Sequence, residues 1–283
     1  MEKLIDLHAH TTASDGSLTP TQLVQLARDS GLGAVAITDH DTIDGVAEGL
    51  AAGAEMNFEV VPGVELSTDL RGKTVHVLGY FIAGDNDHLA EKLAWAKQVR
   101  AERNDRIIER FNELGIEMTL DEVRAEAGGD VVGRPHFARV LLKKGAVATV
   151  QEAFDIYLDR KGKAYVPKFR FTPEESVSLI LQAGGLPVLA HPGLYKWSPL
   201  ELDEAVGDLV ALGLVGLEVL YSTHLPAQVL IYNDIARRHH LLPTGGSDYH
   251  GQTKPDIQLG SGMGDLHVPY AWLAALKAKA DRE

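Results

Sequence analysis

The sequence predicts an α/β fold in which about seven strands alternate with helices to form a barrel, and in which a block of helices is inserted mid-chain. Short apolar runs rich in β-branched residues alternate with helical stretches in both halves of the chain. Such nearly continuous hydrophobicity is typical of parallel strands that helices cover on both faces. Between residues 80 and 186 only helical patterns occur. A chain of 283 residues is long enough for a barrel with a small insertion.

Seven apolar runs are the predicted strands. They are Leu4–Leu7, Ala34–Thr38, Val60–Leu66, Thr74–Tyr80, Leu186–Ala190, Val215–Leu220 and Leu242–Gly245.

Three of the helices between these strands carry the same start signal. A Ser or Thr accepts a backbone N–H, Pro takes the first helical position, and Glu or Gln three residues on bonds back. The signals begin at Thr19, Thr172 and Ser198. The matching stop signals are glycines that can adopt the left-handed conformation, Gly31, Gly184 and Gly213.

The middle of the chain predicts a small helical cap domain. Its amphipathic helices are Asp87–Leu114, Leu120–Ala127, Pro135–Lys144 and Val150–Leu158. We therefore expect a barrel domain made of residues 1–85 and 165–283, interrupted by a cap of residues 86–164.

The overall charge restricts the partners of the protein. The chain has 27 Lys and Arg against 40 Asp and Glu, a formal net charge of −13. A polyanion such as duplex nucleic acid is repelled at long range by this charge, whereas a small anionic substrate can still bind beside metal ions.

Cysteine is absent, which excludes disulfides, thiolate metal ligands and a cysteine nucleophile. The first residues are too charged for a secretory signal, and no apolar run approaches the roughly 18 residues of a membrane span. We expect a cytoplasmic protein that does not enter a membrane.

Histidine and acidic residues recur at or just beyond the ends of the predicted strands, and one further histidine, His76, lies on the fourth strand. They are His8, His10, Asp15, His40, Glu65, His76, His191, Asp248 and His250. The carboxyl ends of barrel strands meet on one face, so these side chains are expected to converge. For His76 alone, a hydrogen-bonded core histidine is an equally good interpretation. His88, His239, His240 and His267 lie in helical or exposed polar stretches and are not expected to take part.

A set of imidazoles and carboxylates without thiolate suits Mn²⁺, which we expect, or alternatively Fe²⁺, Zn²⁺ or Co²⁺. Nine ligands exceed the needs of one ion, so two or three ions are expected, with Glu65 as a carboxylate that can bridge two of them. Two metals roughly 3.5–4 Å apart can hold a bridging hydroxide and stabilise in-line attack at phosphorus. The pattern therefore predicts hydrolysis of phosphate esters.

These motifs resemble those of the PHP (polymerase and histidinol phosphatase) family of the amidohydrolase superfamily. The resemblance covers nearly the whole predicted barrel and includes His8-Ala9-His10, Gly63-Val64-Glu65, Ala190-His191-Pro192 and Gly246-Ser247-Asp248-Tyr249-His250. It implies a distorted seven-stranded (β/α)7 barrel of the TIM type. It also implies three metal sites, formed by His8, His10, Glu65 and Asp248, by Glu65, His76 and His191, and by Asp15, His40 and His250.

Within this family, Val132–Arg139 and Tyr221–His224 most resemble segments of the stand-alone 3′,5′-nucleoside bisphosphate phosphatases. Those enzymes remove the 3′-phosphate, for example from adenosine 3′,5′-bisphosphate to give AMP and phosphate. Their relatives shorten small RNAs from the 5′ end. A role in nucleotide metabolism follows from the resemblance.

A bisphosphate substrate needs a protein site for the phosphate that is not at the metals. Arg134 is the first choice, because a guanidinium can bind phosphate oxygens in a bidentate manner. His136 and Lys168 are expected to complete this pocket. The alternative for Arg134 is a solvated residue at the start of a helix.

Two residues are candidates for acid–base roles. His224 is expected to stabilise phosphate charge or to protonate the leaving alkoxide, and the alternative is that it only structures its loop. Asp248 is expected to orient the attacking hydroxide or to accept its proton.

Three other functions remain open at this stage. A histidinol phosphatase would use the same ligands, although the basic cap argues against an amino-alcohol substrate. A 5′–3′ exonuclease on short 5′-phosphorylated RNA would perform the same hydrolysis on a diester. A catalytically silent metal-binding module would be expected to lack ligands, and none is missing here.

Overall fold

The computed structural model describes residues 3–82, 86–127 and 132–281. The chain divides into two compact units. The first, Met1–Leu93 with Arg170–Glu283, we call the sheet unit, and the second, Ala94–Phe169, we call the helical unit. The predicted domain limits, with a cap of residues 86–164, stay a prediction.

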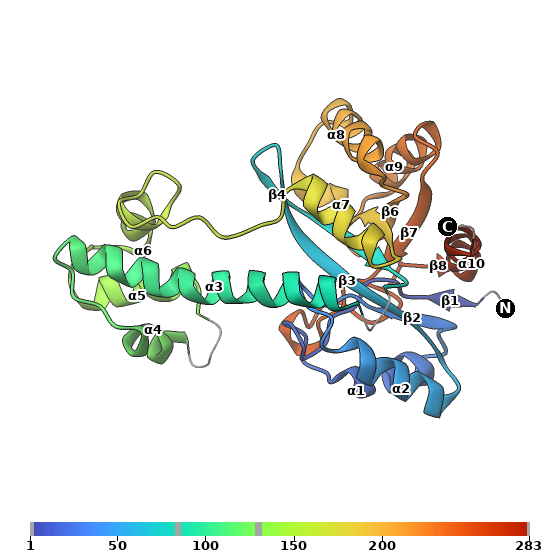
Figure 1. Ribbon diagram of the computed structural model, residues 1–283, viewed down its shortest axis with the longest axis horizontal. Coiled ribbons are helices and arrows are strands. Elements are labelled where there is room, and N and C mark those ends of the chain that lie inside the picture. Colours follow the sequence, from blue (N-terminus) through green and yellow to red (C-terminus); the bar gives the residue numbers. More distant parts are fainter. Residues whose placement is uncertain (1–2, 83–85, 128–131, 282–283) are drawn as a thin grey trace. The chain divides into compact units, whose positions relative to one another are not determined.

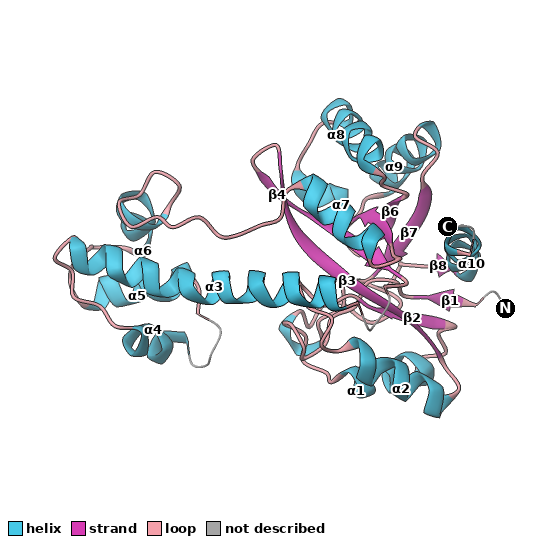
Figure 2. Ribbon diagram, in the orientation of Figure 1, coloured by secondary structure: helices cyan, strands magenta, loops and turns pink. Residues whose placement is uncertain are grey.

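A curled half-barrel of six strands forms the centre of the sheet unit (Figure 2). Its spatial order is β2 (Ala34–Ile37), β3 (Glu59–Leu70), β4 (Lys73–Tyr80), β5 (Leu186–Leu189), β6 (Gly216–Tyr221) and β7 (Leu242–Gly246). All six correspond to predicted strands, and the α/β class is confirmed.

The first predicted strand is shorter than expected. β1 (Leu4–Ile5) pairs antiparallel with β8 (Val268–Pro269) in a separate two-stranded sheet. The chain just after β1 bonds to both edge strands of the larger sheet, since Asp6 N donates to Ala34 O and Leu7 N donates to Gly245 O, each at 3.2 Å. These isolated bonds do not extend the strand, so the predicted count of seven strands in one sheet is not confirmed.

The expectation that all strands run parallel was wrong for β4, which is antiparallel to both β3 and β5. The reason lies in the two-residue connection between β3 and β4. Arg71 and Gly72 both have positive φ, 54° and 76°. This is the backbone of a tight hairpin, which reverses the chain and leaves no room for a crossover helix.

The predicted start signals form as expected. The side chains of Thr19, Thr172 and Ser198 each accept a bond from the backbone N–H three residues on, and complete capping boxes are present at α1 (Pro20–Asp29), α7 (Pro173–Gln182) and α8 (Pro199–Leu212). The stop signals are also confirmed, because Gly31, Gly184 and Gly213 have φ values of 78°, 72° and 113°.

Helices cover the outside of the half-barrel (Figure 1). α1 and α2 (Val46–Met56) pack beside β2 and β3, whereas α9 (Pro226–Arg238) and α10 (Tyr270–Ala280) lie against β6 and β7. A buried cluster that includes Leu7, Leu78 and Val188, together with Leu273 and Leu276 of α10, packs against the strands. This core fixes the strand ends from which the candidate site is built.

The helical unit has a core of its own, centred on Phe111 and Phe137. α3 (Asp87–Glu113) begins in the sheet unit and ends in the helical unit, which also contains α4 (Leu120–Ala127), α5 (Arg134–Lys143) and α6 (Val150–Ala153). The predicted helix over residues 150–158 ends as a π-helical turn, Phe154–Leu158. Among the described residues, no helix combines the length and the hydropathy needed to span a membrane.

Candidate metal centre

All nine predicted ligands gather at one place in the sheet unit. In four overlapping groups, one ligand atom from each residue lies within 4.8 Å of those of the others. The groups are His10, Asp15, His40 and His250; His8, Glu65 and His191; His8, His10 and Asp248; and His40, Glu65 and His76. The groups share members, so the centre is one continuous cluster of histidines and carboxylates.

Most of these side chains come from chain segments that directly follow strands. His8 and His10 follow β1, His40 follows β2, His191 follows β5, and Asp248 and His250 follow β7. Glu65 and His76 instead lie inside β3 and β4, because these two strands continue past the site into their hairpin. The expectation that Glu65 ends its strand was wrong, although its position in the cluster is the expected one.

The Glu65 carboxylate is fully buried at the centre of the cluster. Its Oε1 lies 2.9 Å from Nδ1 of His76 and 2.9 Å from Nε2 of His191. Its Oε2 lies 2.8 Å from Nδ1 of His40 and 3.4 Å from Nε2 of His10. Oε1 also lies 3.3 Å from Nε2 of His8, so the two oxygens face different sets of imidazoles, as a bridging ligand requires.

Two further carboxylates complete the cluster. Asp248 Oδ1 lies 3.1 Å from Nε2 of His10, 3.4 Å from Nδ1 of His250 and 3.6 Å from Nε2 of His8. Asp15, which is half exposed, approaches Nε2 of His250 at 3.2 Å. The cluster thus opens to solvent on the Asp15 side.

The donor atoms fit divalent cations. Buried ring nitrogens without a hydrogen-bond partner include Nε2 of His8, both nitrogens of His10, Nδ1 of His40 and Nδ1 of His191. Nδ1 of His76 and Nε2 of His191 face each other at 3.2 Å. Unpaired buried polar atoms are costly, and several lone pairs that point into one space are stabilised by a cation. The residues present therefore suit a metal centre, and they are the nitrogen and oxygen ligands predicted from the absence of cysteine.

Burial and the neighbouring charges set the ionisation states of the groups in the cluster. Burial lowers the pKa of His10 to about 3, so this imidazole is neutral and ready to act as a ligand. Burial opposes ionisation of Glu65, but the neighbouring His76, His40 and His8 hold the pKa of Glu65 well below its usual range. Burial also disfavours the charged form of His40, yet Glu65 and Asp15 outweigh it and raise the pKa of His40 to about 9.

Glu218, in the middle of β6, is a supporting residue that was not predicted from the sequence. It is fully buried. Its Oε1 lies 2.9 Å from Nδ1 of His8, and its Oε2 accepts a bond of 2.6 Å from the backbone N–H of His191. This carboxylate fixes the ring of His8 so that Nε2 points into the cluster. In the sequence, Glu218 could have been recognised as an acidic residue inside an otherwise apolar strand.

Three more buried carboxylates tie together the backbone that carries the ligands. Asp6 accepts bonds from the backbone N–H groups of His8, Ser247 and Gly260. Asp39 accepts from the backbone and hydroxyl of Thr11, and Asp41 accepts from the backbone and hydroxyl of Ser67. These bonds hold the loops after β1, β2 and β7 in register with one another.

Backbone strain is concentrated in the same loops. Asp41, His191 and Asp248 have φ values of 51°, 23° and 58°. Non-glycine residues rarely adopt such conformations, and each costs on the order of 1–3 kcal/mol. The strain at His191 and Asp248 is held by the surrounding bonds and directs their side chains into the cluster.

The residues predicted to bind a second phosphate belong to the helical unit. Arg134 begins α5, and its Nη1 donates to the carbonyl of Leu158 at 3.2 Å and lies 3.6 Å from Oδ1 of Asp159. Nδ1 of His136 accepts a bond from the backbone N–H of Gly133. Lys168 is exposed. Their role as a phosphate site stays a prediction.

His224 follows β6, and both of its ring nitrogens have partners. Nδ1 lies 2.9 Å from the carbonyl of Val219, and Nε2 accepts a bond of 3.2 Å from the backbone N–H of Gly193. Burial lowers the pKa of His224. These contacts are those expected of a residue that structures its loop, the alternative considered from sequence.

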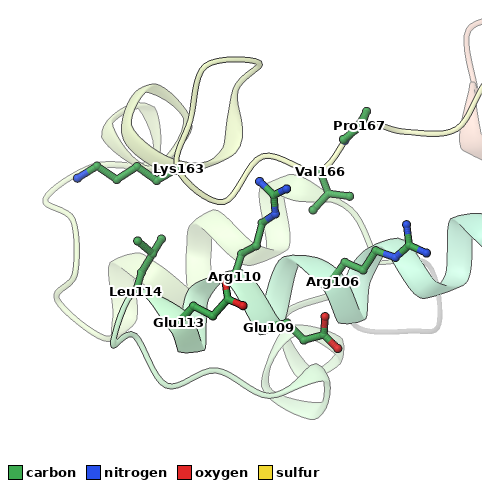
Figure 3. A pocket seen from close by; sticks show the side chains of 8 residues that line it. All are labelled: Arg106, Glu109, Arg110, Glu113, Leu114, Lys163, Val166 and Pro167. Carbon is green, nitrogen blue, oxygen red and sulfur yellow. The ribbon is translucent and has the colours of Figure 1, made fainter.

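A separate pocket of about 580 Å³ lies in the helical unit (Figure 3). It is lined by Arg106, Glu109, Arg110, Glu113, Leu114, Lys163, Val166 and Pro167. Its cations and carboxylates alternate, and Arg106 pairs with Glu102 at 3.3 Å. The lining includes none of Arg134, His136 and Lys168, so we assign this pocket no part in the predicted phosphate site.

Comparison with known proteins gives a consistent result. The profile of the PHP domain matches residues 6–163. The chain is 37% identical over 261 residues to the 5′-3′ exoribonuclease Rnm of Escherichia coli, covering 91% of this chain and 88% of that protein. It is 34% identical to the 3′,5′-nucleoside bisphosphate phosphatase of Chromobacterium violaceum, covering 87% of each chain.

A third relative is the phosphoribosyl 1,2-cyclic phosphate 1,2-diphosphodiesterase of Eggerthella lenta, 31% identical over 87% of this chain and 94% of its own. Among solved structures, a candidate metal-dependent phosphoesterase from Bifidobacterium adolescentis superposes with a TM-score of 0.73. It is 33% identical, and the match covers 98% of this chain and 96% of that one.

The contacts of Glu218 generate a first prediction. In Glu218→Gln, the amide can accept only one of the two bonds from His8 and the His191 backbone, because its NH₂ group faces the other donor. We expect metal affinity to fall by about 10–100-fold with little change in fold. Competition with a chelator, followed by elemental analysis, measures this. Glu204→Gln, which alters an exposed pair with Arg71, is the control. Unchanged affinity in Glu218→Gln would contradict the assignment.

The raised pKa of His40 generates a second prediction. At pH 7.5 the imidazole is mostly protonated in the metal-free protein, and it must lose this proton to bind a metal. Metal uptake should therefore release a proton from His40, and affinity should rise as the pH increases toward 9. Calorimetric titration with Mn²⁺ in buffers of different ionisation enthalpy counts the protons. His40→Gln should release about one fewer, whereas His239→Gln should match the unmodified protein. Equal proton release by all three would refute the prediction.

Proposed function

Since this chain belongs to the PHP-domain family of phosphoesterases, we propose that it is a metal-dependent phosphatase that removes the 3′-phosphate from nucleoside 3′,5′-bisphosphates. The observation that carries the proposal is the gathering of nine imidazole and carboxylate ligands around Glu65. Similarity to a bisphosphate phosphatase along most of both chains supports the substrate class.

The proposal assigns the metal ions to side chains of this chain. The residues that would hold the metals are His8, His10, Asp15, His40, Glu65, His76, His191, Asp248 and His250. Bound divalent ions supply Lewis-acid stabilisation of phosphoryl oxygens and lower the pKa of water. Their number and identity, with Mn²⁺ as the expected ion, are part of the proposal.

Asp248 is the residue that we place next to the attacking water. Its Oδ2 accepts bonds from the Tyr221 hydroxyl and from Nζ of Lys254, each at 2.8 Å. Oδ1 remains directed at the histidines, where it can orient a water molecule or accept its proton. The protonation of the leaving ribose oxygen is the role proposed for His224, in competition with its function in the loop.

The second phosphate of the substrate is assigned to Arg134, His136 and Lys168. Arg134 and His136 lie in the first turn of α5. Backbone N–H groups at the start of a helix favour anions, and a guanidinium there adds charge. The contacts of Arg134 with Leu158 and Asp159 leave its side chain 39% exposed and able to bind a phosphate.

A second candidate function is 5′–3′ hydrolysis of short 5′-phosphorylated RNA. It is favoured by 37% identity to an exoribonuclease of similar length. The chemistry at phosphorus would be the same, and Arg134 would bind the 5′-phosphate of the RNA end.

The substrate assignment is tested with full-length, Mn²⁺-reconstituted protein. Adenosine 3′,5′-bisphosphate, a 5′-phosphorylated oligoribonucleotide and histidinol phosphate are compared at equal concentrations. We expect kcat/KM for the bisphosphate to exceed that for histidinol phosphate by at least about tenfold, because only the bisphosphate provides a second phosphate for Arg134. A preference for histidinol phosphate would overturn the assignment, and release of mononucleotides from RNA would add the second function. Absence of hydrolysis with every ester would favour a silent metal-binding module.

Arg134 provides a separate test of how the substrate is held. Arg134→Met should raise KM for adenosine 3′,5′-bisphosphate by about 10–100-fold and change KM for adenosine 3′-monophosphate much less, because only the bisphosphate engages the guanidinium. Arg124→Met, which removes an exposed arginine paired with Asp121, is the control in the same unit. Equal effects of Arg134→Met on both substrates would show that Arg134 does not bind the second phosphate.

A further inference from the structure

Lys254 lies six residues after Asp248, and its Nζ donates to Oδ2 of Asp248 at 2.8 Å. We propose that Lys254 is a substrate-binding residue that donates to a non-bridging oxygen of the phosphate that reacts at the metal centre. The proposal rests on the phosphatase function proposed above, and it concerns a different phosphate from the one assigned to Arg134.

The loop that carries Lys254 is held against the loop that carries Asp15. Gln252 N donates to the hydroxyl of Ser17 at 2.8 Å, and the hydroxyl of Thr253 donates to the carbonyl of Asp15 at 3.1 Å. The backbone of Lys254 itself bonds to Gly251 on one side and to Ile257 on the other. These bonds fix the backbone of the loop from which the Lys254 side chain reaches Oδ2 of Asp248.

Asp248 does not use the full hydrogen-bonding capacity of Lys254. Oδ2 of Asp248 already accepts a bond from the buried hydroxyl of Tyr221. An ammonium has three N–H donors, and only one of them is directed at Asp248. The side chain of Lys254 is 42% exposed, whereas that of Asp248 is 6% exposed. A lysine that served only as the counter-ion of the buried Asp248 carboxylate would not need to be exposed to solvent. The other N–H donors of Lys254 can therefore bind a ligand that enters from solvent.

Charge favours a phosphate as that ligand. The candidate centre contains three carboxylates, Asp15, Glu65 and Asp248, and the chain as a whole has a net charge of −13. A phosphate that approaches from solvent is repelled by these groups until a cation offsets them. A lysine ammonium is a compact, flexible cation well suited to a single phosphate oxygen. Lys254 places such a charge beside Asp248, whose other oxygen faces the ligand atoms of His8 and His10.

The test compares Lys254→Met and Lys254→Arg with a matched control. Lys277 belongs to a similar group, in which its Nζ contacts Glu59 and donates to the hydroxyl of Tyr270 at 3.2 Å. Its side chain is 41% exposed, and Glu59 begins β3, outside the groups of candidate ligands. Lys277→Met therefore removes a comparable lysine from a Lys–Tyr–carboxylate group away from the centre.

Three quantities are measured on each full-length, Mn²⁺-loaded variant. Elemental analysis gives the bound metal, calorimetric titration gives the affinity for inorganic phosphate, and steady-state assays give kcat and KM for adenosine 3′,5′-bisphosphate. We expect Lys254→Met to keep its metal, to bind phosphate about tenfold more weakly and to show a raised KM. Lys254→Arg should restore most of the phosphate affinity, and Lys277→Met should match the unmodified protein.

Two outcomes would overturn the proposal. Phosphate affinity equal to that of the unmodified protein in Lys254→Met would show that the ammonium does not contact the anion. Loss of metal from Lys254→Met would show that Lys254 acts only through Asp248. If the unmodified protein hydrolyses no bisphosphate but its phosphate binding depends on Lys254, the proposed function fails while the phosphate contact stands.

Discussion

The rest of the site depends on the burial of one carboxylate, Glu65, among imidazoles. An isolated carboxylate with no exposed surface would be strongly destabilising, because ionised groups lose their hydration on burial. Here the histidines around both oxygens hold the pKa of Glu65 low and keep it ionised. The arrangement leaves buried ring nitrogens without hydrogen-bond partners, and a divalent cation would satisfy several of them together. The imidazoles that stabilise the buried Glu65 carboxylate are therefore the same groups that provide nitrogen ligands for a divalent metal.

A second set of carboxylates keeps this cluster in position. Glu218 connects the ring of His8 to the backbone of His191, and Asp6 connects the loops after β1 and β7. Their bonds also hold the strained backbone at His191 and Asp248. Rigidity of this kind is what a metal-dependent phosphoesterase needs, because ligands that relaxed would approach one another and close the space for a metal ion. Lys254 extends the same network to its solvent-exposed rim.

Much of this could be predicted because the signals are local. Capping boxes at Thr19, Thr172 and Ser198 depend only on residues three apart, and all three helices begin there. The ligands could be predicted because the carboxyl ends of the strands in a β/α barrel meet on one face. This holds whatever the order of the strands in the sheet. The direction of β4 was predicted wrongly, since an apolar run does not reveal its orientation. The direction of β4 is set by the tight turn at Arg71 and Gly72, which reverses the chain after β3.

The sequence by itself determined which residue types can bind a metal here and on which segments they lie, because ligand chemistry and strand periodicity are properties of short stretches. Only the tertiary structure decided which atoms face each other. It revealed that Glu65 lies among five imidazoles, that Glu218 supports His8 across 210 residues of chain, and that Lys254 reaches Asp248. Such contacts depend on register and on side-chain direction, which are fixed only when the whole sheet packs.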